Sequence, residues 1–327
     1  MKERFVSRVL TSGNLRAAWN KVRKNGGVAG ADDVSLRRFA RDWEKYLVEL
    51  QQAARTNTYQ PKRLRRFRLR KPGGGWRVIS VPTVADRVLQ RAVLNVLEMP
   101  LDRKFLDCSY GYRPKRSLQD AVDQIIAYRN AGLDWVLDAD VDAFFDSLDH
   151  ELLIGFLREE IADEQVLNLI ALWLKAGQRN SQVGDCFPVR FAQGLRASLA
   201  MTQTRRTVGV PLGSPISPLL ANVYLHRFDR VMVETGWRLV RYADDFIVLG
   251  PTRAEVEEAR RFAVWALKQL RLQLDPGKTR VTSFDEGFDF LGVHFEGNTY
   301  SYLWKDKRVT VKGERDVWHF PYPPEGY

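Results

Sequence analysis

The sequence has few of the residues that bind transition metals or form disulfides. Its 327 residues include two cysteines, Cys108 and Cys186, and four histidines, and neither set has the spacing of a metal site. We therefore predict buried or half-buried thiols in a reducing cytoplasm, which excludes a secreted disulfide scaffold. No apolar run approaches the roughly 18 residues of a membrane span, and the N-terminus lacks the apolar core of a signal peptide. We expect no membrane partner.

Positive charge is what the sequence has in excess. It has 51 Lys and Arg residues against 40 Asp and Glu residues, a formal net charge of +11. Such an excess favours a polyanionic partner, although many soluble proteins carry similar charge without one. The hydrophobic content of 45% and the charged content of 28% are ordinary for a globular protein.

Two adjacent aspartates stand out in the last third of the chain. Asp244 and Asp245 lie between two apolar, β-branched runs within residues 237–250, a pattern that predicts a β-hairpin with the aspartates at its turn. Neighbouring carboxylates in apolar surroundings resist joint ionisation, and a divalent cation such as Mg²⁺ removes that cost. A solvated turn is the commoner meaning of the dipeptide alone.

A second strand supplies the missing carboxylate. Residues 135–141 predict a strand that places Asp138 and Asp140 on one face. A sheet could bring Asp140 beside Asp244 and Asp245, and three such carboxylates can hold two Mg²⁺ ions, which activate an attacking hydroxyl and neutralise a leaving pyrophosphate. We expect Asp146 and Asp149 to be turn and helix-cap residues instead.

Two basic segments favour a nucleotide or nucleic-acid partner. Residues 61–82 predict a hairpin with arginines on alternate positions and a glycine-rich tip, and its Lys71 and Arg77 could grip phosphates. A solvated basic edge strand is the alternative, since charge there blocks aggregation. Residues 107–117 interleave aromatic and cationic residues, which suits base stacking with charge on the backbone.

Helical periodicity accounts for much of the remaining chain. We expect Ser117 to cap one helix and Pro100 to end another. Helices are expected at 14–23, 34–52, 84–101, 117–130, 151–161, 166–177, 219–233 and 253–272, and further strands at 279–284 and 288–295. Residues 178–208 lack clear periodicity, and we assign them no role.

Taken in order, segments over roughly residues 10–296 resemble the reverse transcriptases of bacterial group II introns and their relatives. The segments are RLRKPGGGWRVISVPTVADRVLQRAVLNVLE, SYGYRPKRSLQDAV, DADVDAFFDSLDH, VPLGSPISPLLANVYLHRFD, YADD, LDPGKT and FDFLGVHF. Their order is more specific than any one of them. Leu212 departs from the pattern, because intron-type members usually carry Gln there, and 178–208 is longer than the usual connection.

The resemblance implies an α+β right-hand polymerase fold with fingers and palm. A central antiparallel sheet would be flanked by helices, and the thumb would be reduced or absent from this chain. The fingers would span 1–134, the palm 135–296 with 178–208 as an irregular insertion, and a tail or the start of a thumb or linker 297–327.

The resemblance also implies the metal centre. Asp140 and Asp244 would be the main ligands of two Mg²⁺ ions, with Asp245 and Val141 beside them, and Mn²⁺ could substitute. Lys278 could protonate the leaving pyrophosphate.

Further residues would contact the nucleotide and the nucleic acid. Phe145 would be a steric gate that excludes a 2′-hydroxyl, which implies DNA synthesis. The full set of implied nucleotide contacts is Lys71, Arg77, Val141, Asp142, Phe145, Pro211 and Gly213. The implied nucleic-acid contacts are Arg66, Arg68, Tyr112, Arg113, Lys115 and Arg116.

The implied partners are an RNA template, a DNA or RNA primer and dNTPs. The segment FLDCSYGYRPKRS and the ending PPEGY are closer to reverse transcriptases associated with CRISPR adaptation genes. Those occur alone or fused to a Cas1 integrase and act in acquiring spacers from RNA, so a Cas1/Cas2 integrase or a fused Cas1 domain is an expected partner. A group II intron or another defence system stays open, as do an RNA-synthesising polymerase on the same palm and a non-catalytic RNA-binding scaffold.

Overall fold

The structure, a computed structural model, describes residues 5–70, 74, 76–178, 207–304 and 307–312. The chain forms two compact units, residues 1–98 with 145–217 and residues 99–144 with 218–327. The predicted division into fingers and palm at residue 134 stays a prediction, and the compact units divide the chain at other points. No helix within the described ranges is both long and apolar enough to cross a membrane.

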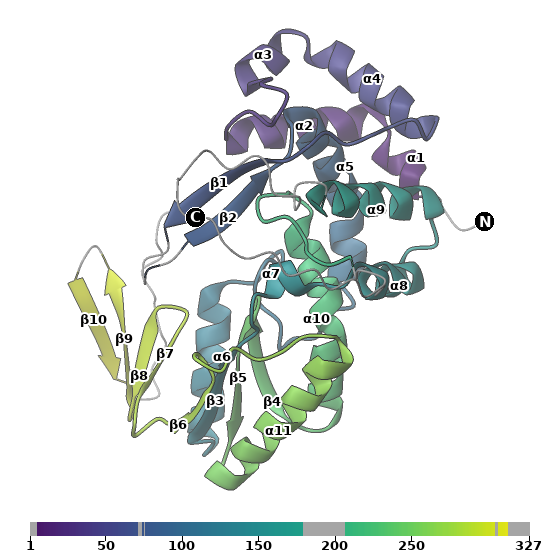
Figure 1. The fold of residues 1–327 in the computed structure, drawn as a ribbon. Coiled ribbons are helices and arrows are strands. Elements are labelled where there is room, and N and C mark those ends of the chain that lie inside the picture. The colour runs from purple at the N-terminus through teal and green to yellow at the C-terminus, as the bar shows by residue number, and fades with distance from the viewer. Residues whose placement is uncertain (1–4, 71–73, 75, 179–206, 305–306, 313–327) are drawn as a thin grey trace, which may run out of the picture. The chain divides into compact units, whose positions relative to one another are not determined.

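The first unit is mainly helical (Figure 1). Its strands β1 (Arg65–Arg70) and β2 (Trp76–Val81) pair antiparallel, as the basic hairpin predicts. Its helices are α1 (Phe5–Val9), α2 (Ser12–Asn25), α3 (Leu36–Arg41), α4 (Trp43–Arg55), α5 (Val84–Asp102), α7 (Phe144–Ser147), α8 (His150–Glu160) and α9 (Glu164–Gln178), of which α5 ends and α7 begins in the second unit.

Two helix predictions in this region are wrong in detail. The expected helix at 34–52 is broken at Asp42, whose φ of −125° is not helical. The apolar period continues across the break because both α3 and α4 bury one face. Pro100 does not end α5 but lies in its last turn, where a missing N–H removes only one helical hydrogen bond.

The second unit is built on an antiparallel sheet of order β4-β5-β3-β6 (Figure 1). The predicted aspartate hairpin is formed by β4 (Arg238–Tyr242) and β5 (Asp245–Gly250), and the strand that carries Asp140 is β3 (Trp135–Asp140). The remaining strand of the sheet is β6 (Arg280–Ser283), and the helices around the sheet are α6 (Leu118–Asn130), α10 (Ser217–Glu234) and α11 (Arg253–Gln269). Helix α11 lies against β3, β5 and β6, and α6 against β4.

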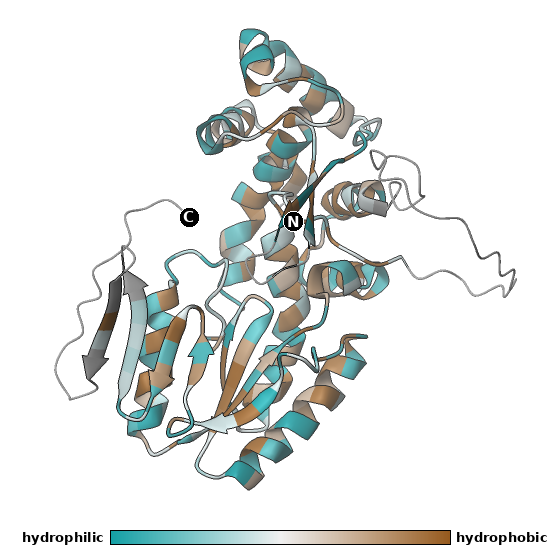
Figure 2. Ribbon diagram, turned by 60° about the vertical axis from the view of Figure 1, so that its left-hand side comes forward, coloured by the Kyte–Doolittle hydropathy of each residue, from teal (hydrophilic) through white to brown (hydrophobic). Residues whose placement is uncertain are grey.

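The sheet separates its apolar residues onto two faces. Val136 and Ile247 pack with Ile125 of α6 on one face, and Phe246 contacts Phe228 of α10 on the other, with ring centroids 5.0 Å apart. Hydrophobic and hydrophilic residues alternate along the helices around the sheet (Figure 2). Both faces are therefore covered, as an α+β architecture with a central antiparallel sheet requires.

Two of the predicted helix caps are present in the structure. Ser117 and Asp120 form a reciprocal capping box at the start of α6, and the Asp149 side chain accepts hydrogen bonds from Glu151 and Leu152 at the start of α8. The predictions for Ser117 and Asp149 are confirmed. Asp146 instead lies within α7.

The C-terminal strands differ from the prediction. The single strand expected at 288–295 is a hairpin of β7 (Phe288–Phe290) and β8 (Val293–Glu296), because Leu291 and Gly292 both take positive φ in a two-residue turn. The segment predicted as a tail, or as the start of a thumb or linker, adds β9 (Thr299–Trp304) and β10 (Lys307–Lys312), which complete a sheet of order β10-β9-β8-β7.

Candidate active site

Two of the predicted catalytic aspartates are neighbours across the central sheet. Asp140, at the end of β3, pairs with Asp245, the first residue of β5. Residues directly opposed in an antiparallel ladder place their side chains on the same face, where like charges are destabilising. Because the Asp140 residue is 6% exposed whereas Asp245 reaches solvent, the pair lies at the boundary between the sheet and water.

The third aspartate lies in the turn that joins β4 to β5. Tyr242 pairs with Asp245, so the turn consists of Ala243 and Asp244. Ala243 has φ of 59°, the left-handed conformation that is disfavoured for a residue with a Cβ. The predicted tight turn is confirmed, and it places Asp244 directly before the Asp140–Asp245 pair.

The electrostatics of this edge favour a cation. Burial and the neighbouring carboxylates of Asp140 and Asp244 raise the pKa of Asp245 to about 7. One carboxylate oxygen of Asp140, Oδ1, is buried and has no hydrogen-bond partner among the described residues. An orphaned carboxylate oxygen beside a second carboxylate matches the hard oxygen donors that Mg²⁺ prefers. The donor chemistry therefore fits a divalent cation, although no three His, Cys, Asp or Glu side chains of the described ranges already form a metal-binding group.

Lys278 compensates part of the negative charge. Its ammonium pairs with Oδ2 of Asp140. Lys278 lies in a turn that begins at Asp275, and the Asp275 N–H donates to the Asp140 carbonyl at 2.8 Å. The hydrogen bond with Asp140 raises the pKa of Lys278, although its side chain is 61% exposed. Next to it, the Asp142 N–H donates to the carbonyl of Gln273 at 2.9 Å, and Val141 bridges to Leu274.

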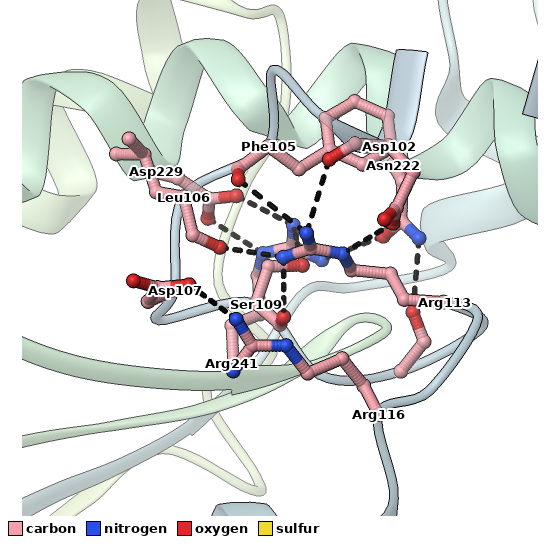
Figure 3. A network of polar contacts seen from close by, with 11 residues as sticks. Asp102, Phe105, Leu106, Asp107, Ser109, Arg113, Arg116, Asn222, Asp229 and Arg241 are labelled. Atoms are coloured by element: carbon pink, nitrogen blue, oxygen red, sulfur yellow. Dashed lines mark hydrogen bonds and ion pairs between the residues drawn. The ribbon is translucent and has the colours of Figure 1, made fainter. Parts of the chain in front are cut away.

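One predicted nucleic-acid contact, Arg113, is engaged within the protein. The Arg113 side chain is 5% exposed, and its guanidinium donates to a carboxylate oxygen of Asp102 and to four backbone carbonyls (Figure 3). The carbonyls are those of Asp102, Phe105, Leu106 and Ser109. Arg113 therefore organises its own loop, since all five N–H groups are engaged within the protein.

The rest of this loop is more accessible. Tyr112 is 52% exposed, with φ of 59°, and Lys115 is exposed with φ of 60°. Arg116 pairs with Asp107 and lies over the ring of Tyr110, with its guanidinium carbon 5.5 Å from the centroid. Tyr112, Lys115 and Arg116 stay predicted nucleic-acid contacts.

A buried arginine beside the Ala243–Asp244 turn was not predicted. Arg241 forms a bidentate ion pair with Asp229, at 2.6 Å for each hydrogen bond, and also contacts Asn222 and Ser109 (Figure 3). An arginine within an apolar strand was the available signal in the sequence.

In the first unit, the basic hairpin carries its charges on two faces. Arg77 pairs with Leu69, whereas Arg68 pairs with Val78 and Arg66 with Ser80. Because side chains alternate along a strand, Arg77 lies on one face and the other two arginines on the opposite face. All three are exposed. Lys71 lies outside the described residues.

The loop before α10 packs against this hairpin within the same unit. The Ser80 N–H donates to the carbonyl of Leu212 at 2.7 Å, and a Cβ on Gly213, whose φ is 101°, would lie 3.0 Å from Ile79. The Ser217 hydroxyl donates to the Pro211 carbonyl at 2.7 Å. Close packing and backbone conformation thus account for Gly213, and nucleotide contact by Pro211 and Gly213 stays a prediction.

The predicted steric gate lies at the start of α7. Phe145 is 9% exposed, and its carbonyl accepts a hydrogen bond from Val210 at 2.7 Å. The gate role stays a prediction.

Known proteins resemble the chain over most of these segments. The family profile described as "Reverse transcriptase (RNA-dependent DNA polymerase)" matches residues 69–295. Protein YkfC of Escherichia coli is 30% identical over 273 residues, which cover 72% of this chain and 67% of that protein. The group II intron-encoded protein LtrA of Lactococcus lactis is 31% identical over 206 residues, which cover 62% of this chain and 31% of that protein. Among solved structures, a partial Cas6-RT-Cas1–Cas2 complex matches with a TM-score of 0.45 and 24% identity, over 82% of this chain and 42% of that chain.

Proposed function

The chain belongs to the reverse transcriptase family, and from that premise we propose that it extends a primer along an RNA template with dNTPs. The observation that carries the proposal is the pairing of Asp140 with Asp245 beside the Asp244 turn. Asp140, Asp244 and Asp245 would hold two Mg²⁺ ions, with Mn²⁺ as a substitute. When bound, such ions lower the pKa of an attacking hydroxyl and neutralise the leaving pyrophosphate.

The chain's own residues would orient the reactants and move one proton. Lys278 stays an ammonium at neutral pH, because its hydrogen bond with Asp140 raises its pKa, so it can donate a proton to the leaving pyrophosphate. Arg77 and Lys71 would hold the triphosphate, with Val141, Asp142, Pro211 and Gly213 around the nucleotide. Phe145 would exclude the 2′-hydroxyl of a ribonucleotide.

Primer extension tests this proposal. The substrate is a DNA primer annealed to RNA, with dNTPs and Mg²⁺, and the variant is Asp244→Ala. The matched control is Asp138→Asn, because Asp138 lies on β3 but pairs with Arg280 at 3.1 Å rather than with the turn. We expect extension by wild type and the control but not by Asp244→Ala. An active Asp244→Ala variant, or an inactive wild type that binds RNA, would favour the non-catalytic scaffold.

For the cellular setting, we propose spacer acquisition from RNA in the cytoplasm beside a Cas1–Cas2 integrase. The support is the sequence likeness of residues 105–117 to CRISPR-associated members of the family. Co-purification with Cas1–Cas2, and loss of RNA-derived spacers in an Asp244→Ala strain, would agree with it. Normal spacer acquisition in that strain would instead favour an intron or another defence system.

A further inference from the structure

Every N–H donor of the Arg241 guanidinium is hydrogen-bonded within the protein. Nε and Nη2 donate to the two carboxylate oxygens of Asp229, each at 2.6 Å. Nη2 also donates to the Ser109 hydroxyl at 2.7 Å, and Nη1 to the side-chain oxygen of Asn222 at 3.2 Å. The remaining N–H of Nη1 donates to the carbonyl of Ala243 at 2.8 Å. All five donors of the guanidinium have acceptors, and the side chain is 1% exposed.

The last of these contacts reaches the catalytic turn. Ala243 has a positive φ, which is unfavourable for a residue with a Cβ and persists only where its surroundings hold it. Its carbonyl belongs to the peptide that leads into Asp244. The guanidinium is planar and rigid, so a fork anchored on Asp229 fixes the position of the carbonyl that it holds.

A loop of the same unit supports the turn from another side. The Arg241 N–H donates to the Cys108 carbonyl at 2.7 Å, and the Tyr110 N–H donates to the Arg241 carbonyl at 2.9 Å. Gly111 follows so closely that a Cβ on it would lie 2.5 Å from the Ala243 nitrogen. Asn222 joins the two sides, because its amide donates to the Gly111 carbonyl at 2.9 Å while its oxygen accepts from Arg241.

We propose that Arg241 is a positioning residue, which holds the Ala243–Asp244 turn in the geometry that binds the divalent ions. This inference rests on the proposed function, because it assigns a purpose to the same aspartates. A buried ion pair contributes little net stability compared with apolar residues of similar volume. What Arg241 supplies beyond its pairing with Asp229 is a directed hydrogen bond to the turn.

Two variants test the proposal by different routes. Arg241→Lys keeps a positive charge beside Asp229, but a single ammonium cannot also reach Ala243, Asn222 and Ser109. Gly111→Ala leaves every charge in place and displaces the turn through one methyl group. The matched control is Arg87→Lys, which alters a buried arginine of the other unit that donates to the Gly26 and Val28 carbonyls.

The primary measurement is Mn²⁺ binding to the whole protein without substrate, followed by electron paramagnetic resonance. Primer extension then gives kcat and KM for the annealed RNA template. We expect the Mn²⁺ affinity and the kcat of both site variants to fall about 10- to 100-fold, the loss typical of groups that orient metal ligands. The KM for the RNA template should stay unchanged, and excess Mg²⁺ should restore part of kcat. Arg87→Lys should change thermal stability only.

The outcomes separate the two proposals. If wild type binds Mn²⁺ and extends primers, and Gly111→Ala does both equally well, the positioning role is wrong even where Arg241→Lys fails to fold. If both site variants lose stability but keep their Mn²⁺ affinity and kcat, Arg241 is only structural. If wild type itself neither binds Mn²⁺ nor extends a primer, the proposed function fails and the positioning role fails with it.

Discussion

Asp140 and Asp245 lie directly opposite each other in the β3–β5 ladder, so the register of the sheet itself brings two carboxylates together. Neither residue would have this neighbour if either strand were shifted by one position, because a one-residue shift moves side chains to the other face.

The first prediction follows from the repulsion between the carboxylates of Asp140 and Asp245. Asp245→Asn should stabilise the metal-free protein at pH 8 by up to about 1 kcal/mol, since opposed like charges destabilise a sheet. The effect should disappear near pH 5, because the pKa of Asp245 is about 7 and the carboxyl is then protonated in wild type. Urea unfolding at both pH values measures it. The same variant should extend primers about 100-fold more slowly or worse, because a proposed metal ligand is lost.

Asp289→Asn is the control, because Asp289 is an exposed carboxylate paired with His294 on another sheet. A less stable Asp245→Asn protein at pH 8 would contradict the first prediction.

Lys278→Ala should separate metal binding from turnover. Removing the ammonium that pairs with Asp140 should strengthen Mn²⁺ binding, because a positive charge no longer competes for the carboxylate. Extension should nevertheless slow by about 100-fold, the usual loss when a general acid is removed. Mn²⁺ titration and single-turnover kinetics measure the two effects. An unchanged rate would mean that Lys278 donates no proton in the reaction.

The gate assignment predicts a change of sugar selection. Phe145→Ala should raise the incorporation of ribonucleotides relative to deoxyribonucleotides by about 10-fold or more, since the side chain that excludes the 2′-hydroxyl is shortened. Both Phe145 and Phe144 are buried, so each substitution to Ala should cost stability. Phe144→Ala therefore serves as the matched control. Equal sugar selection in the two variants would show that Phe145 is not the steric gate.

Lys115 and Arg113, two of the three cations of the 107–117 loop, should behave differently. Lys115→Gln should weaken RNA binding for all sequences and reduce the salt dependence of binding by about one unit of slope, because one phosphate contact is lost. Arg113→Gln should instead unfold the loop and lower the melting temperature, because buried acceptors lose their donors. Filter binding across a salt series, with thermal unfolding of each variant, distinguishes them. An Lys115→Gln variant with the wild-type salt slope would contradict the prediction.

Stability should also depend on two histidines. Burial lowers the pKa of His150 and of His226, so the folded protein resists protonation that the unfolded chain accepts. Their contribution is therefore complete above pH 6.5 and is lost as the pH falls below it. Asp245 acts in the opposite direction over part of this range, so the comparison uses variants. His150→Gln should lose less stability than wild type between pH 7.5 and pH 5.5 in urea unfolding, and an equal loss would contradict the prediction.

The sequence alone was sufficient for features that depend on local periodicity and on near neighbours. Alternation over 135–141 predicted β3, and two apolar runs around Asp244 predicted the hairpin. The capping box of Ser117 needs only a residue three positions away. Such patterns can be recognised because strand alternation and helix caps act over a few residues.

Only the tertiary structure decided which charged residues are available. Arg113 and Lys115 look alike in the sequence, but the carbonyls of residues 102–109 surround the first and leave the second exposed. Arg241 resembles a surface charge within a strand, yet its side chain is buried and pairs with Asp229 of α10 at 2.6 Å. Partners from distant segments set the burial and pairing of a charge. The sequence therefore determined where the carboxylates lie along the strands, and the packed fold decided which cations neutralise, position or surround them.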